Sequence, residues 1–189
     1  MLVVAATPRE LAPSRGWGTV TCGVGPVDAA VATSAALATA TLPWRAVLHV
    51  GIAGARDGAN LPLGTIVIGS ASHYDDLGVP EHFAPRVIHP DATLLAAARR
   101  ALPDAHVYPI ATTARVGGSQ SAPVEAMEGF AVLRAAAHAG VPALEVRVIS
   151  NVVEEQDRTR WAFDEAFARV IAITPTLVTA IARAVASTD

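Results

Sequence analysis

The sequence predicts an α/β protein with three layers, in which helices cover both faces of a central sheet. Short, continuously apolar runs rich in β-branched residues recur along the chain, and several lead through small or polar residues into alanine-rich stretches of helical character. Strands of this kind are buried on both faces. The chain has 189 residues and no linker long enough to divide it, so residues 1–189 are expected to form a single domain.

The amino-acid composition indicates which kinds of binding partner to expect. The formal net charge is -3 and 16% of the residues are charged, which provides neither a broad basic surface for nucleic acid nor an acidic tail. The expected partner is therefore a small molecule and not nucleic acid. Hydrophobic residues make up 52% of the chain, which indicates a well-covered core, apolar surface used in self-association, or both.

Other features favour the cytoplasm. The single cysteine, Cys22, excludes an internal disulfide and suits a reducing compartment. The N-terminal segment MLVVAATPRE has neither the basic lead nor the apolar length of a signal peptide. No apolar run reaches the roughly 18 residues that a membrane-spanning helix needs, so no membrane partner is expected.

Leu2–Ala6 is predicted to be an interior strand, with Glu10 just past its carboxyl end. Pro8 suits the first position of a helix. Glu10 then either complements the helix dipole or serves a site at the end of the strand.

A second strand is predicted over 18–24, followed by a long helix. Between them, Gly23-Val24-Gly25 forms the kind of turn that brings main-chain N–H groups against phosphate or ribose oxygens. A dinucleotide site would also need an acidic residue at the end of the next strand. That strand, 46–50, is followed by no acid before Asp57, which argues against NAD, and no cofactor is expected.

Small residues follow the third strand at Gly51-Ile52-Ala53-Gly54, where a tight turn is predicted. Leu61–Gly69 is predicted to form another turn and strand, and 92–102 an amphipathic helix. The polar cluster His73–Gly78 is interpreted as part of a subunit contact or the rim of a pocket. Its histidine lacks an i, i+4 partner on a helix and no Cys is near, so no metal site is expected.

Met127-Glu128-Gly129 leads into a helix that ends at Gly140. The apolar run 143–150 is predicted to be a strand buried on both faces, ending in the polar turn Ser150-Asn151. Because ligand-binding groups gather at the carboxyl ends of strands in α/β sheets, Glu128 and Asn151 are expected to face one crevice.

The remaining segments are a strand over 106–114, a flexible loop over 115–123, and two helices at the C-terminal end. The first of these helices is predicted to run from Asp157 or Thr159 to about residue 173. The second begins at Pro175, which cannot continue a helix without losing a hydrogen bond.

These motifs resemble those of the nucleoside phosphorylase/nucleosidase superfamily. There, a Met-Glu pair before a helix binds the ribose, a Gly-x-Ala-Gly turn lies under base and ribose, and an Ile-Ser-Asp or Ile-Ser-Asn turn meets the purine. The matching residues are Met127-Glu128, Gly51–Gly54 and Ile149–Asn151. The resemblance implies a nucleoside phosphorylase-like fold with a central mixed, twisted sheet, and a homo-oligomer (a dimer or larger).

Within the superfamily, these motifs together with Asp157–Trp161 are most similar to the futalosine hydrolases. This resemblance implies hydrolysis of the N-glycosidic bond of futalosine, with release of hypoxanthine and dehypoxanthinyl futalosine, as a step of menaquinone biosynthesis.

The resemblance also implies roles for individual residues. Glu10 would activate the attacking water and Asn151 would meet the base, as the two catalytic residues. The residues expected to bind the substrate are Glu128, Met127, Ile52, Ala53, Gly54, Val116 and Trp161. Trp161 or Phe163 would close over the purine, and either could equally belong to the core. The substrate's carboxylate would be met by Arg147, Arg158 or Arg160.

The amide at position 151 favours a 6-oxopurine as the leaving group. Asn carries both an NH₂ donor and an acceptor oxygen, which match O6 and N7–H of hypoxanthine. Adenine would place its own amino group against the donor and leave a buried group unpaired, at a cost of about 1 to 3 kcal/mol. The sequence therefore predicts release of hypoxanthine and not adenine.

Water is favoured over phosphate as the nucleophile. The phosphorylases of the superfamily carry an N-terminal Gly-Asp-Pro-x-Arg element that this chain lacks, and the spacing of Arg9, Arg15, Arg45 and Arg56 marks no phosphate site. The alternatives are a methylthioadenosine/S-adenosylhomocysteine nucleosidase, a purine nucleoside phosphorylase, or a non-catalytic nucleoside-binding module in which Glu10 would be structural.

Overall fold

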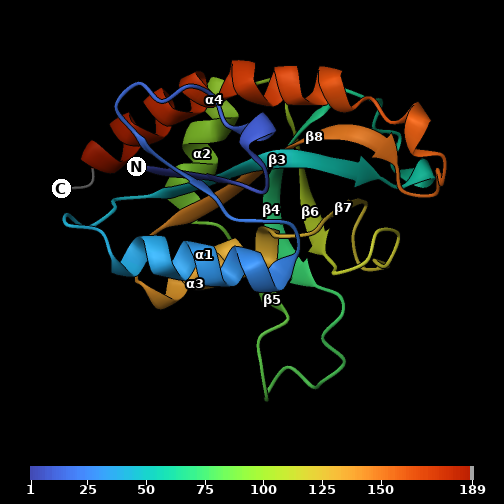
Figure 1. The fold of residues 1–189 in the computed structure, drawn as a ribbon, viewed down its shortest axis with the longest axis horizontal. Coiled ribbons are helices and arrows are strands. Elements are labelled where there is room, and N and C mark those ends of the chain that lie inside the picture. The colour runs from blue at the N-terminus through green and yellow to red at the C-terminus, as the bar shows by residue number, and fades with distance from the viewer. Residues whose placement is uncertain (188–189) are drawn as a thin grey trace.

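The computed structural model describes residues 1–187 and has three layers, with a mixed, twisted sheet between two pairs of helices (Figure 1). Helices α1 (Pro26–Ala38) and α3 (Gly129–His138) cover one face of the sheet. Helices α2 (Ala92–Ala101) and α4 (Phe163–Ala186) cover the other face. The predicted α/β/α architecture with a central mixed sheet is confirmed.

Eight strands of the described chain form the sheet: β1 (Leu2–Ala5), β2 (Gly18–Thr21), β3 (Val47–Ala55), β4 (Ile66–Tyr74), β5 (Val87–Ile88), β6 (His106–Thr112), β7 (Val124–Ala126) and β8 (Ala143–Val152). Their order is β2-β1-β3-β7-β6-β4-β5, and β8 pairs with both β3 and β4. Strands β1, β2, β3 and β8 are parallel to their neighbours in this group, whereas β4 is antiparallel to β8. The carboxyl ends of β1, β3 and β8 therefore meet at one edge.

Strand β8 is buried on both faces, as predicted, but the two faces differ in polarity. Leu144, Val146 and Val148 pack into the core with α2 and α4, as expected of an interior strand. Successive strand residues point to opposite faces, so Glu145 and Arg147 point toward the α1 and α3 layer. Both charged side chains are only 1% exposed. The expectation of a strand buried on both faces is therefore confirmed, although one of these faces buries charged side chains.

The segments Gly51–Gly54 and Ser150–Asn151 are strand residues, which corrects the two turns predicted there. β3 and β8 pair in parallel from Val47 and Ala143 onward, with one irregularity between Ala53 and Gly54. Within this pairing, the main-chain N–H and C=O groups of both segments find hydrogen-bond partners on the neighbouring strand. In a turn they would need other partners. The small residues remain necessary, because a Cβ on Gly54 would lie 2.9 Å from Nδ2 of Asn151.

A single helix, α4, replaces the two helices predicted on either side of Pro175. One continuous face of this helix is buried against the sheet and α2, and Pro175 lies inside it. The Thr174 hydroxyl donates to the carbonyl oxygen of Val170, 2.7 Å away. The packing of this long apolar face outweighs the main-chain hydrogen bond that proline removes. Asp157 instead caps the short 3-10 turn η3 (Arg158–Arg160).

Helix α4 is the segment of the described chain to compare with the length and hydropathy that a membrane span requires. By length and hydropathy alone, Phe163–Ala186 meets that criterion. This is weak evidence, because a helix that covers the core of a soluble protein passes the same test.

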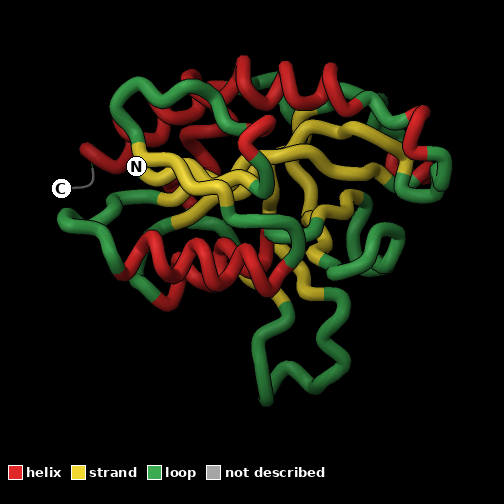
Figure 2. Tube along the Cα trace, in the orientation of Figure 1, coloured by secondary structure: helices red, strands yellow, loops and turns green. Residues whose placement is uncertain are grey.

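The segment 75–86 between β4 and β5 projects away from the layers (Figure 2). At its start, the Asp75 carboxylate accepts main-chain N–H hydrogen bonds from Gln120 (2.7 Å) and Ser121 (3.0 Å), and Asp76 accepts one from Ala114. These carboxylates fix the loop 115–123, which lies beside the carboxyl ends of the parallel strands. The described residues contain no group of three or more His, Cys, Asp or Glu side chains that could hold a metal ion.

Candidate active site

A cavity of about 440 Å³ lies at the carboxyl ends of β1, β3 and β8. Its volume is within the range typical of small-molecule sites. It brings together all nine predicted site residues: Glu10, Ile52, Ala53, Gly54, Val116, Met127, Glu128, Asn151 and Trp161. A larger, open groove between α2 and α4 is lined by Arg100, Arg183 and mostly small residues, with no carboxylate or amide side chain.

Glu10 belongs to the 3-10 turn η1 (Pro8–Glu10), which follows β1 directly. Its Oε2 accepts hydrogen bonds from the main-chain N–H (2.8 Å) and the hydroxyl (2.9 Å) of Thr7, and its Oε1 accepts one from the N–H of Ile52 at 3.2 Å. The side chain is 2% exposed. Burial raises the pKa of Glu10, although Arg147 and these hydrogen bonds oppose the rise. A carboxylate with a raised pKa is a stronger base.

Glu128 immediately precedes α3, but its side chain does not cap that helix. Its Oε1 accepts the main-chain N–H of Gly25 at 3.1 Å, and its Oε2 accepts from Nη2 of Arg147 at 3.2 Å. The Gly23-Val24-Gly25 turn therefore uses a main-chain N–H to hold this carboxylate. Glu128 is 4% exposed and lines the cavity, so a bound sugar would meet an oriented acceptor.

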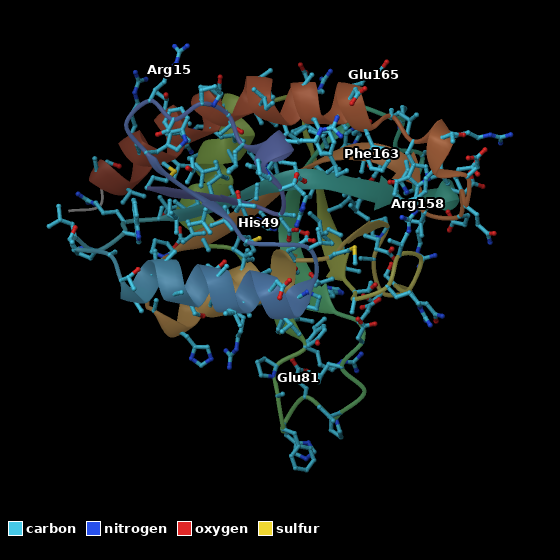
Figure 3. All side chains as sticks on the ribbon, viewed as in Figure 1. Arg15, His49, Glu81, Arg158, Phe163 and Glu165 are labelled. Atoms are coloured by element: carbon cyan, nitrogen blue, oxygen red, sulfur yellow. The ribbon has the colours of Figure 1, made fainter. Side chains whose placement is uncertain are left out.

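Below the cavity lies a buried cluster that the sequence analysis did not foresee. Arg147 donates from Nε to Oε1 of Glu145 at 2.8 Å and from Nη2 to Nε2 of His49 at 2.5 Å. His49 must then carry its proton on Nδ1, which donates to the carbonyl oxygen of Val4 at 3.0 Å. Burial and Arg147 hold the pKa of His49 well below its usual value, so this imidazole is neutral. Figure 3 shows His49 in the middle of the molecule.

The carboxylates around Arg147 raise its pKa above the usual guanidinium value, although burial acts in the opposite direction. Glu145, Glu128 and Glu10 each contribute. Arg147 is thus a permanent positive charge shared by three acids. Cys22, close to the same groups, has its pKa raised to about 12, mainly by burial, and remains a neutral thiol.

Asn151, near the end of β8, is 5% exposed and lines the cavity. Its Oδ1 accepts from the Ser150 hydroxyl at 2.9 Å, and its Nδ2 donates to the carbonyl oxygen of Val152 at 3.0 Å. An amide has two N–H donors and an oxygen with two lone pairs. One donor and one lone pair therefore remain for a ligand.

Aromatic side chains from the start of α4 form an apolar wall. Trp161 and Phe163 lie 5.3 Å apart between ring centroids, and Phe167 continues the row. All three line the cavity and none is fully buried, so the alternative that Trp161 or Phe163 belongs to the core is wrong. Phe167 was not foreseen from the sequence. Figure 3 shows Phe163 and Arg158 on the side where α4 begins.

Glu125 fixes the loop 115–123, which forms a wall of the cavity other than the aromatic one. Its Oε1 accepts the N–H of Gly117 at 2.6 Å and its Oε2 that of Ser119 at 2.7 Å. Val116 is held beside the cavity by this arrangement. The two carboxylates three residues apart therefore have different partners, since Glu125 holds a loop and Glu128 is held by Gly25 and Arg147.

The candidate arginines fall into two groups, those that line the cavity and those that do not. Arg147 and Arg158 line the cavity. Arg160 pairs with Glu155 at the surface (3.1 Å) and is absent from the cavity wall. In the described part of the chain, none of Arg9, Arg15, Arg45 and Arg56 lines it either.

Fold and cavity together define an α/β protein with a small-molecule-sized cavity at the carboxyl ends of its parallel strands. The chain belongs to the Phosphorylase superfamily, whose sequence pattern matches residues 18–183. This range includes Glu128 and Asn151 and begins after Glu10. The chain is 37% identical over 177 residues to futalosine hydrolase of Streptomyces coelicolor, which covers 81% of this chain and 74% of that protein.

Solved structures show the same fold at lower identity. Native futalosine hydrolase of Helicobacter pylori superposes with a TM-score of 0.80 at 15% identity, covering 94% of this chain and 96% of that one. An S-adenosylhomocysteine nucleosidase of Streptococcus pyogenes, in complex with 5-methylthiotubericidin, gives a TM-score of 0.79 at 20% identity, with 94% of each chain covered.

Proposed function

We propose that this protein hydrolyses the N-glycosidic bond of futalosine and releases hypoxanthine and dehypoxanthinyl futalosine. The observation that carries the proposal is the presence of Glu10, Glu128 and Asn151 on one cavity. The relative from Streptomyces coelicolor, a futalosine hydrolase at 37% identity, supports the same substrate. Residues 1–189 would act as one nucleosidase domain.

The chemistry needs groups on both sides of the scissile bond. As the bond breaks, positive charge develops on the ribose and negative charge on the departing base. Glu128 would accept hydrogen bonds from the 2′ and 3′ hydroxyls and stabilise the cationic sugar. Glu10 would take a proton from the attacking water, for which its raised pKa suits it. Met127 would pack against the sugar.

Asn151 would select the base. Its remaining N–H matches O6 of a 6-oxopurine, and its remaining lone pair matches N7–H of the departing hypoxanthine. Val116 and Trp161 would flank the ring, while Ile52, Ala53 and Gly54 allow its close approach.

Hydrolysis is favoured over phosphorolysis by the charges of the cavity wall. Arg147 is engaged by Glu145, Glu128 and His49. Arg158, at the rim, is then the candidate to meet the carboxylate of the substrate. Its guanidinium lies 5.7 Å from the Trp161 ring centroid, and no ion pair with it is found among the described residues.

The proposal extends to the setting of the reaction. We place the enzyme in menaquinone biosynthesis in the cytoplasm, acting without metal or cofactor. We also propose a homo-oligomer, a dimer or larger. Exposed apolar side chains on α1 and on the projecting segment support this, since Val27, Val31 and Phe83 are each at least 66% exposed.

Incubation of the purified protein with futalosine, inosine and methylthioadenosine, with and without phosphate, tests the proposal by chromatography of the released base. Hypoxanthine from futalosine, at a rate independent of phosphate, is the expected result. Faster release of adenine from methylthioadenosine would favour the adenosine-type nucleosidases, and dependence on phosphate would favour a phosphorylase.

Glu10→Gln separates an enzyme from a nucleoside-binding module. The variant should lose about 10²- to 10⁴-fold in kcat and still bind futalosine, because the amide cannot accept a proton from water. Calorimetric titration measures the binding. If the wild-type protein binds futalosine and releases no base, the binding module is the correct alternative.

A further inference from the structure

Glu145 is a fully buried acid with no role in the proposed reaction. It lies on β8 two residues before Arg147, so both side chains point to the same face, and its neighbour across the parallel pairing with β3 is His49. The residue beside Arg147 in that pairing is Gly51, which leaves the guanidinium room to extend toward the cavity. Glu145 itself does not line the cavity.

The second oxygen of Glu145 lies against the start of α3. A Cβ built on Gly129 would be 2.1 Å from Oε2, so only glycine leaves space for the carboxylate there. The N-terminus of a helix favours negative charge. Oε2 has no hydrogen-bond partner among the described residues, and Arg147 Nε is the donor that Oε1 receives. Glu145 is thus built into the structure chiefly for Arg147.

Four contacts fix the guanidinium of Arg147. Glu145 holds Nε, His49 and Glu128 share Nη2, and the carbonyl oxygen of Ile52 accepts from Nη1 at 3.3 Å. Without Glu145, the side chain would keep contacts only at its far end, and the plane of the guanidinium would be free to tilt. A tilt would alter both the orientation of Glu128 and the charge that acts on Glu10.

Charge balance also depends on Glu145. Arg147 lowers the pKa of Glu10, against the larger effect of burial. The negative charge of Glu145 offsets part of the guanidinium's positive charge. The other groups facing this cluster are Glu128, neutral His49 and neutral Cys22, and neither of the last two changes charge near neutral pH.

We propose that Glu145 is a positioning residue for glycoside hydrolysis, which fixes Arg147 through Nε and thereby sets the orientation of Glu128 and the base strength of Glu10. The proposal rests on the function given above. It requires an ionised Glu145 in the working enzyme.

Glu145→Gln tests the proposal, because it removes the negative charge and replaces the charge-assisted hydrogen bond to Nε with a weaker neutral one. We expect kcat on futalosine to fall about 10- to 100-fold, as for a small misplacement of catalytic groups. The acid limb of the kcat/KM profile should move to lower pH, since the less compensated Arg147 favours ionised Glu10. A purely structural role would not move this limb.

A double-mutant cycle with Arg147→Lys shows whether Glu145 acts through Arg147. Lysine keeps the charge but lacks the Nε donor and the planar fork. In that background there is no Nε hydrogen bond to weaken, so Glu145→Gln should change kcat at the pH optimum by no more than about twofold, whereas effects that multiply would overturn the proposal. Glu165→Gln, on the exposed side of α4 (Figure 3), is the control and should match the wild type.

Failure of the proposed function and failure of the positioning role give different results. If the wild-type protein releases no base from any nucleoside, the proposed function fails. If it is active and Glu145→Gln has the wild-type kcat and pH profile at an unchanged melting temperature, Glu145 is neutral or irrelevant, and the positioning role is refuted.

Discussion

Gly51 allows two groups to meet below the cavity, and adding one methyl group to it should inactivate the protein. A Cβ at this position would lie 2.3 Å from Nη1 of Arg147 and 2.8 Å from Oε1 of Glu10. Both distances are shorter than any ordinary contact, so at least one group must move. Arg147 is held by contacts at all three nitrogens, and Glu10 is held by three hydrogen bonds.

For Gly51→Ala, the crowding should cost about 1 to 3 kcal/mol of stability, as overpacking of cores generally does. For a protein of this size, that corresponds to a melting temperature lower by about 2 to 12 °C. Activity should suffer far more, because displacement of Glu10 removes a contribution of about 10²- to 10⁴-fold to kcat. Thermal melting and chromatography of released hypoxanthine measure the two effects.

Gly58→Ala is the matched control, since a Cβ there has no heavy atom within 4 Å and Gly58 lies outside the cavity wall. It should match the wild type in both assays. A Gly51→Ala protein with wild-type kcat/KM would refute the reasoning, because it would show that neither Arg147 nor Glu10 needs the space. A loss of stability alone would refute the catalytic part.

Two further substitutions test the walls of the cavity. Asn151→Asp replaces the donor to O6 with an acceptor. The ratio of kcat/KM for inosine to that for adenosine should therefore fall by about 5- to 150-fold, the equivalent of about 1 to 3 kcal/mol for an unpaired buried group. Parallel assays on the two nucleosides measure this ratio, and an unchanged ratio would show that Asn151 does not bind the base selectively. Glu125→Gln leaves one acceptor oxygen where the carboxylate accepts two main-chain N–H groups, so the loop that carries Val116 should loosen. KM for futalosine should then rise about tenfold, with a smaller change in kcat. A drop in kcat alone would instead assign Glu125 to the chemical step.

Much of the fold follows from local sequence patterns. The short apolar runs at β1, β3 and β8 and the positions of α2 and α3 depend on residues close in sequence, so they were predictable. The errors fall where distant segments decide the outcome. Pro175 predicts a helix boundary locally, but the buried face of α4 makes the helix continuous. Gly51–Gly54 indicates a turn, but the long pairing with β8 keeps it in a strand.

The site residues likewise fall into those that local motifs predict and those that depend on distant segments. Glu10, Met127, Glu128 and Asn151 belong to short motifs with a recognisable order, and the structure brings them to one cavity. His49 and Glu145 belong to no such motif. Their only sign in the sequence is charged or polar residues at alternate positions of an apolar strand, as in Leu144–Val148. That alternation indicates a polar face, but it does not tell which partners that face meets.

In the proposed reaction, the buried charges would favour the transition state over the bound substrate. Three carboxylates surround one guanidinium, and burial raises the pKa of both Glu10 and Glu145 although Arg147 opposes the rise, so one guanidinium balances their negative charge only in part. In the proposed reaction, a ribose that becomes an oxocarbenium ion would supply a positive charge beside Glu128 as the bond breaks. Under the proposed function, the buried carboxylates would therefore stabilise the reacting sugar more than the neutral nucleoside, and this difference in binding would raise the rate.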